Sequence, residues 1–123
     1  MTTIKRIDGD YAEEFVAKKL EQEGFTICAR NYRKLYGEID IIAEKKDVLA
    51  FVEVKMRRSN VISMKEIITY GKQKKIIAVA KEYIAKHRIQ NRVCRFDAAL
   101  VFLDGSGQLH INYIPNAFQD RSY

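Results

Sequence analysis

The chain of 123 residues is poor in the features that mark several classes of protein, with one proline, two cysteines and no internal repeat or low-complexity tract. No apolar run approaches the roughly 20 residues that a membrane-spanning helix needs. The opening residues, MTTIKRIDGDYAEE, lack the apolar stretch of a signal peptide. A hydrophobic content of 47% is enough for a core. We therefore expect a single domain, residues 1–123, that is soluble, cytoplasmic and not bound to a membrane.

Cysteine is scarce and badly spaced for metal binding or cross-linking. Cys28 and Cys94 each lie in a short apolar-rich segment, without a partner at the spacing of metal ligands. We predict two buried, reduced thiols, and neither a zinc site nor a disulfide framework.

The first periodic segment, GDYAEEFVAKKLEQEGF, predicts an amphipathic helix. Asp10 is a candidate N-cap, and Gly24 supplies a stop signal. The apolar stripe consists of Ala12, Phe15, Val16 and Leu20.

Three strand patterns follow: FTICARNYR, GEIDIIA and VLAFVEVK. The polar connector EKKD between the last two is short enough for an antiparallel hairpin. Both of these strands carry apolar residues on two faces, as central strands do, with Ile39 and Ile41 expected on one face and Ile42 on the other.

The second half begins with a basic connection that includes a short helix around Met64–Tyr70. KQKKIIAVAKEYIAKHRI then predicts a second amphipathic helix, and VCRFDAALVFL and LHINYI predict two strands joined by the turn DGSGQ. The order α-β-β-β-α-β-β predicts an α/β fold in which helices flank a central mixed sheet of about five strands.

Positive charge exceeds negative charge, giving a formal net charge of +6. From Lys55 to Lys75 the only acidic residue is Glu66. Such a surface attracts polyanions, nucleic acid first, although a merely solvated surface is an equal alternative. The basic residues in this range are Lys55, Arg57, Arg58, Lys65, Lys72, Lys74 and Lys75.

A Glu-x-Lys triplet occurs twice, as Glu44 with Lys46 and as Glu53 with Lys55. Composition alone predicts about one such triplet by chance. Only the second lies within an apolar strand, where the period of two places Glu53 and Lys55 on one face. Asp40 can approach Glu53 across the predicted hairpin.

Two neighbouring carboxylates repel each other unless a cation lies between them. Oxygen ligands from carboxylates, a backbone carbonyl and waters suit Mg²⁺ or Mn²⁺. Such an ion activates water and neutralises charge on phosphate, and a lysine assists it, which indicates phosphodiester hydrolysis. The alternative is an ordinary ion pair at a strand end, with Lys55 bound to Glu53 or Asp40.

The combination of GEID, FVEVK and RFD at these separations resembles the YraN-like family of small bacterial proteins, assigned to the PD-(D/E)XK nuclease superfamily. The resemblance implies a restriction endonuclease-like fold. It makes Asp40 and Glu53 metal ligands and Lys55 the catalytic lysine. Glu13 would complete the metal site, with Glu14 as the alternative register, and Ile39 stands where the superfamily name has proline.

The resemblance also places Gln73 near the active site, where a solvated helix position is the simpler interpretation. Together with the basic run it gives a predicted nucleic-acid-binding set, Arg57, Arg58, Lys72, Gln73 and Lys75. Arg95 and Asp97 of RFD are expected to form a structural pair at the edge of the sheet.

The implied activity is a Mg²⁺- or Mn²⁺-dependent endonuclease acting on DNA, with branched or junction DNA among its candidate substrates. Cutting two strands symmetrically would require a homodimer. The alternatives are a non-catalytic nucleic-acid-binding module and a protein-interaction factor that uses its basic face.

Overall fold

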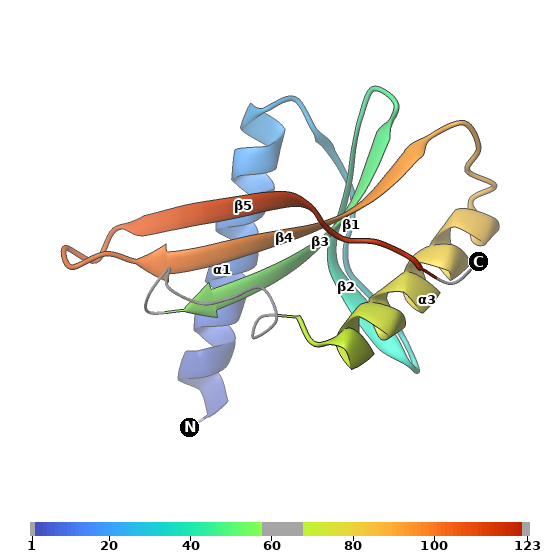
Figure 1. Cartoon of the computed structure of the whole chain (residues 1–123). Helices are drawn as coiled ribbons and strands as arrows, with labels where there is room; N and C mark the ends of the chain where they lie inside the picture. The colour runs from blue at the N-terminus through green and yellow to red at the C-terminus, as the bar shows by residue number, and fades with distance from the viewer. Residues whose placement is uncertain (1, 58–67, 122–123) are drawn as a thin grey trace.

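The computed structural model describes residues 2–57 and 68–121. The elements follow the predicted order, and the short helix predicted from Met64 falls largely outside the described residues (Figure 1). The elements are α1 (Thr2–Gln22), β1 (Thr26–Lys34), β2 (Gly37–Lys45), β3 (Val48–Arg57), α3 (Tyr70–Lys86), β4 (Val93–Leu103) and β5 (Leu109–Phe118).

The five strands form one mixed sheet in the order β1-β2-β3-β4-β5, which confirms the predicted fold class. Neighbours pair antiparallel except β3 and β4, which are parallel. A parallel pair needs a long connection, because the chain must return to the starting end of the sheet. This connection contains α3, which packs on one face of the sheet against side chains of β2 and β3.

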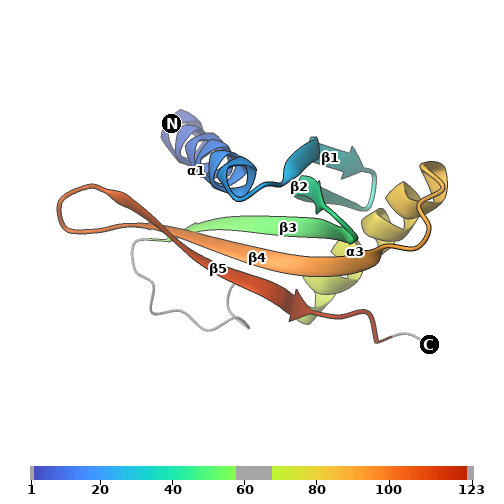
Figure 2. The ribbon, with the colours of Figure 1, turned by 90° about the horizontal axis from the view of Figure 1, so that it is seen from above.

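The two helices cover opposite faces of the sheet (Figures 1 and 2). Helix α1 buries Ala12, Val16 and Leu20 in one apolar cluster, and α3 buries residues such as Ile76 and Val79 in the other. Strands β2 and β3 supply side chains to both clusters. They are therefore central strands covered on both sides, as predicted.

Helix α1 begins earlier than the sequence pattern indicated. It starts at Thr2, so Asp10 lies inside the helix and the predicted N-cap is wrong. Gly9 does not interrupt the helix, because one glycine costs only about 1 kcal/mol there. The predicted stop is confirmed: Gly24 has φ 96°, and the amide of Phe25 donates to the carbonyl of Leu20 at 3.0 Å.

Helix α3 starts with a side-chain cap. The hydroxyl oxygen of Thr69 accepts a hydrogen bond from the amide of Lys72 at 3.2 Å. The helix ends at Lys86, three residues before the end of the predicted segment, because Arg88 adopts φ 51° and breaks the helical backbone.

Both cysteines are free, as expected, but both are exposed, so the prediction of buried thiols is wrong. Cys28 lies on the edge strand β1, where the register shifts between Ile27 and Ala29. Cys94 lies near the start of β4, next to the exposed Val93. Their apolar neighbours in sequence did not indicate which side of the sheet the thiols face.

Arg95 and Asp97 form the expected ion pair, with two 2.9 Å hydrogen bonds from the guanidinium to the carboxylate. The carboxylate also accepts hydrogen bonds from the Tyr113 hydroxyl at 2.5 Å and from the Asn116 amide at 2.9 Å. The predicted position at the sheet edge is wrong, since β4 lies between β3 and β5. Asp97 is fully buried and stabilises the irregular pairing of β4 with β5.

Among the described residues, neither helix is long and apolar enough to cross a membrane.

Candidate active site

The antiparallel pairing of β2 with β3 ends at Ile41 and Val52. One step further, the carboxylate of Asp40 accepts a hydrogen bond from the amide of Val54 at 2.8 Å. A side chain thus replaces the β2 backbone as the partner of β3. The register places Asp40 opposite Glu53, which satisfies the predicted proximity of the two carboxylates.

The pairing of β2 with its other neighbour is irregular at the same point. On β1, Arg30 and Tyr32 pair with Ile41 and Ile39, and the intervening Asn31 has φ 51°. Ile39 lies in the apolar cluster under α3, whereas Ile41 lies in the cluster under α1. The prediction that these two isoleucines share a face is therefore wrong, because the alternation of β2 breaks at Asp40, the residue between them.

Glu53 is the buried acid of the site, with a residue exposure of 5%. Its carboxylate lies 2.8 Å from the ammonium of Lys72 and 3.7 Å from that of Lys55. Glu53 and Lys55 face α3 together, as the strand period predicts. The ordinary ion pair of Lys55 with Glu53, the alternative to a catalytic site in the sequence analysis, is present, but Lys72 lies closer to Glu53.

These side chains surround a cavity of about 220 Å³ between the starts of β2 and α3 and the end of β3. Its lining combines three carboxylates and three lysines with the apolar Val54 and Ile76. The lining residues are Gly37, Glu38, Asp40, Glu53, Val54, Lys55, Lys72, Lys75 and Ile76.

Burial and the charge of Glu53 raise the pKa of Asp40 to about 8, although the hydrogen bond from Val54 opposes the shift. Burial lowers the pKa of Lys55, and the neighbouring Lys72 adds to this effect. For Lys72, burial also favours the neutral form, but hydrogen bonds and the charge of Glu53 raise its pKa overall. The pKa values of three groups in one cavity are therefore perturbed, a pattern that is common at functional sites.

Glu13 and Glu14 of α1 differ in which way they face. Glu14 is exposed and bonds to Arg30 at 2.6 Å, whereas Glu13 is half-buried. Burial raises the pKa of Glu13, and its charge acts on Asp40. Glu13 borders a second hollow with Asn31 and Glu38, so it, and not Glu14, is the acid on the side of the site.

The residues present fit a divalent cation in their chemistry. Glu13 Oε1 is buried without a hydrogen-bond partner, and Asp40 carries a raised pKa. However, within residues 2–57 and 68–121 no three acidic, histidine or cysteine side chains are gathered closely enough to enclose a metal ion. Asp40 and Glu53 would hold the ion together with waters, and the charges of Glu13 and Glu38 also act on Asp40.

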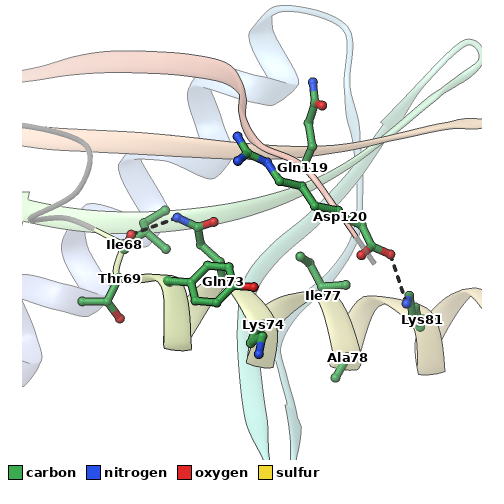
Figure 3. Close-up of a pocket in the computed structure, with 11 residues that line it drawn as sticks. Ile68, Thr69, Gln73, Lys74, Ile77, Ala78, Lys81, Gln119 and Asp120 are labelled. Atoms are coloured by element: carbon green, nitrogen blue, oxygen red, sulfur yellow. Dashed lines mark hydrogen bonds and ion pairs between the residues drawn. The ribbon is translucent and has the colours of Figure 1, made fainter. Parts of the chain in front are cut away.

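The predicted nucleic-acid-binding residues divide into three groups. Lys72 and Lys75 line the cavity. Arg57, at the end of β3, donates to the carbonyl of Met56 at 2.9 Å. Gln73 is not among the residues that line the cavity, and its side-chain amide donates to the carbonyl of Ile68 at 3.2 Å (Figure 3). Arg58 lies outside the described residues.

Two roles were missed in the sequence. Lys72 binds Glu53 directly, and Glu38 lines the cavity. A signal for Lys72 existed, since Lys72, Lys75, Ile76 and Val79 recur at the spacing of one helix face. The buried Ile76 and Val79 show that this face meets the sheet.

A larger hollow of about 740 Å³ lies along another face of α3, bordered by Gln73, Ile77 and the ion pair of Lys81 with Asp120 (Figure 3). It extends from Ile68 to Arg121, at two limits of the described chain. Its lining holds one carboxylate, Asp120, which is paired with Lys81, whereas the smaller cavity brings Glu38, Asp40 and Glu53 together. The smaller cavity is therefore the candidate active site.

Comparison with known proteins gives the family. The profile described as "Uncharacterised protein family UPF0102" matches residues 12–101, which include Glu13, Asp40, Glu53 and Lys55. The chain belongs to the UPF0102 family. This confirms the YraN-like resemblance, while membership of the PD-(D/E)XK superfamily stays a prediction.

Relatives in the UPF0102 family match over nearly their whole length. A UPF0102 protein of Dictyoglomus turgidum is 39% identical over 112 residues, covering 89% of this chain and 95% of the relative. A UPF0102 protein of Clostridium acetobutylicum is 40% identical over 121 residues, covering 97% and 99%. One from Alkaliphilus metalliredigens is 41% identical over 111 residues, covering 89% and 96%.

Proposed function

We propose that this UPF0102 protein is a Mg²⁺- or Mn²⁺-dependent endonuclease that hydrolyses phosphodiester bonds in DNA. The observation that carries the proposal is the pairing of the partly buried Asp40 with the buried Glu53, beside Lys55 and Lys72. Such a pair is costly without a cation, and the raised pKa of Asp40 expresses that cost. The resemblance of these residues to the PD-(D/E)XK arrangement supports the same chemistry.

A bound divalent ion would supply an activated water and neutralise charge on the scissile phosphate. The chain's own residues provide the remaining functions. Asp40 is held in place by the Val54 amide, and Glu53 by its burial. Lys55 projects into the cavity, where its ammonium can stabilise the negative charge that develops on the phosphate. Lys75, exposed at the rim, is placed to contact the DNA backbone.

The proposal predicts metal-dependent cleavage of DNA that depends on the cavity. Asp40→Asn and Lys55→Met should each reduce the cleavage rate at least about 100-fold, as expected when an electrostatic group of an active site is removed. The measurement is product formation from end-labelled linear, flapped and four-way-junction DNA with Mg²⁺ or Mn²⁺.

Glu44→Gln is the matched control, because Glu44 belongs to the other Glu-x-Lys triplet and bonds to Arg92 away from the cavity. It should cleave at the parental rate. Equal cleavage by the parent, Asp40→Asn and Lys55→Met would refute the catalytic role.

One observation favours a second candidate, a non-catalytic nucleic-acid-binding module. The Lys72 ammonium already lies 2.8 Å from Glu53, where a metal ion would otherwise compensate the carboxylate. Salt-sensitive DNA binding without cleavage would support this candidate. If neither binding nor cleavage is found, a protein-interaction role for the basic face gains support.

A further inference from the structure

The turn between β1 and β2 exposes two large apolar residues. Leu35 has a relative exposure of 107% and Tyr36 one of 47%. They are the two residues between the paired Lys34 and Gly37, so they form the tip of this hairpin. Exposing a leucine completely leaves its apolar surface in water and contributes nothing to the core.

The chemistry of the turn does not explain these residues. Two-residue hairpin turns favour asparagine, aspartate or glycine, which accept positive φ. The turn of the next hairpin is polar, with Lys46 at φ 55° followed by Asp47. The β4–β5 turn is polar too, and Asp104 bonds to Ser106 within it. Leu35 and Tyr36 depart from local preference, which is expected at functional positions.

The tip is held next to the cavity. Gly37, directly after Tyr36, packs so closely on α3 that an added Cβ would lie 3.2 Å from Lys75 Cβ and Val79 Cγ2. Gly37 and Glu38 line the cavity. Figure 1 shows the β1–β2 turn beside α3. The two apolar side chains therefore project from a braced turn at the edge of the candidate active site.

We propose that Leu35 and Tyr36 form a wedge that contacts unstacked bases at a fork or branch in DNA, so that branched DNA is the substrate class of this cavity. The inference rests on the proposed function. Proteins commonly insert apolar side chains between base steps, and aromatic side chains stack on exposed bases.

Charge favours DNA over a second copy of the chain as the occupant. Beside the tip, Lys34 ends β1 and lies 3.3 Å from Glu82. Lys72 and Lys75 line the cavity, and Lys75 is the exposed one of the two. A phosphate backbone lying along these cations would bring its bases to the tip, because bases and phosphates lie on opposite sides of the sugar. A second copy would bring the same cations together and oppose them.

The test compares the double variant Leu35→Ala/Tyr36→Ala with the parent, and with Leu103→Ala as a control. Leu103 is 42% exposed at the end of β4 and is absent from the cavity lining. A forked duplex carries 2-aminopurine at its first paired position, with Ca²⁺ in place of Mg²⁺. Binding of the parent or of Leu103→Ala should unstack the 2-aminopurine and so raise its fluorescence. The double variant should need a protein concentration at least about fivefold higher to reach half of this increase.

Urea unfolding checks that each variant keeps the fold. The free energy of unfolding should stay close to that of the parent, because the altered side chains are exposed. The proposal is overturned if the parent leaves the fluorescence unchanged, or if the double variant acts like the parent. It is also overturned if the double variant only converts a dimer to a monomer in sedimentation.

The two proposals fail separately. Cleavage of fully paired duplex without a fluorescence change at the fork would overturn the wedge and leave the nuclease. A fluorescence rise that depends on Leu35 and Tyr36, without cleavage in Mg²⁺ or Mn²⁺, would overturn the nuclease and support the wedge.

Discussion

Asp40 serves the fold and the candidate site at the same time. Its carboxylate replaces the β2 backbone as the partner of the Val54 amide and also lines the cavity. One hydrogen bond compensates only part of the cost of burying this group beside Glu53. In the absence of a cation, the protein therefore gains stability when Asp40 takes up a proton.

This linkage predicts the pH dependence of stability in the metal-free protein. The folded pKa of Asp40, about 8, lies above its ordinary value of 3.8, so the folded state binds the proton more tightly. Stability should fall as the pH rises from about 4 to about 8, by at most about 1.4 kcal/mol per pH unit from this group. Asp40→Asn, whose amide oxygen can keep the Val54 contact, should remove that part of the slope.

The measurement is urea unfolding at several pH values in EDTA, comparing the parent with Asp40→Asn. Glu14→Gln is the control, because Glu14 is an exposed acid that does not line the cavity. A difference in stability between the parent and Asp40→Asn that stays constant from pH 4 to pH 8 would contradict the linkage.

At the scale of elements, the β1–β2 hairpin and α3 form the cavity by packing directly on each other. Gly37 permits this approach, since an added Cβ would lie only 3.2 Å from Lys75 Cβ and Val79 Cγ2. The same contact fixes Glu38 and the turn residues Leu35 and Tyr36 relative to Lys72. The geometry of the site thus depends on a residue that carries no chemistry.

Gly37→Ala should therefore destabilise the protein by about 1–3 kcal/mol through overpacking. It should also weaken cleavage by separating β2 from α3. Gly71→Ala is the matched control: a Cβ there meets no atom within 4 Å, and alanine in the first turn of α3 favours the helix. Urea unfolding measures both, and equal stability of the two variants would show that the close approach is unimportant.

For the whole molecule, the parts of the site come together because β3 and β4 run parallel. The parallel pair forces a crossover, and the crossover lays α3 over the end of β3. Lys72 thereby reaches Glu53, 19 positions away along the printed chain. The positive charge of the basic segment is in this way brought to the buried acids.

The sequence predicted the fold where local pattern decides it. Apolar residues on two faces of GEIDIIA and VLAFVEVK identified the central strands, and the period of two placed Glu53 beside Lys55. It failed where backbone irregularity or tertiary packing decides. The alternation of β2 breaks at Asp40 and places Ile39 and Ile41 on opposite faces, and the pairing of Lys72 with Glu53 depends on how α3 crosses the sheet.

The central claim of the account is that Asp40 and Glu53 bind a divalent cation. Isothermal titration of the metal-free protein with Mn²⁺ tests it without relying on any substrate. We predict one site per chain in the parent and in Glu44→Gln, and at least tenfold weaker binding in Asp40→Asn and Glu53→Gln. No binding by the parent, or equal binding by all four proteins, would contradict the claim.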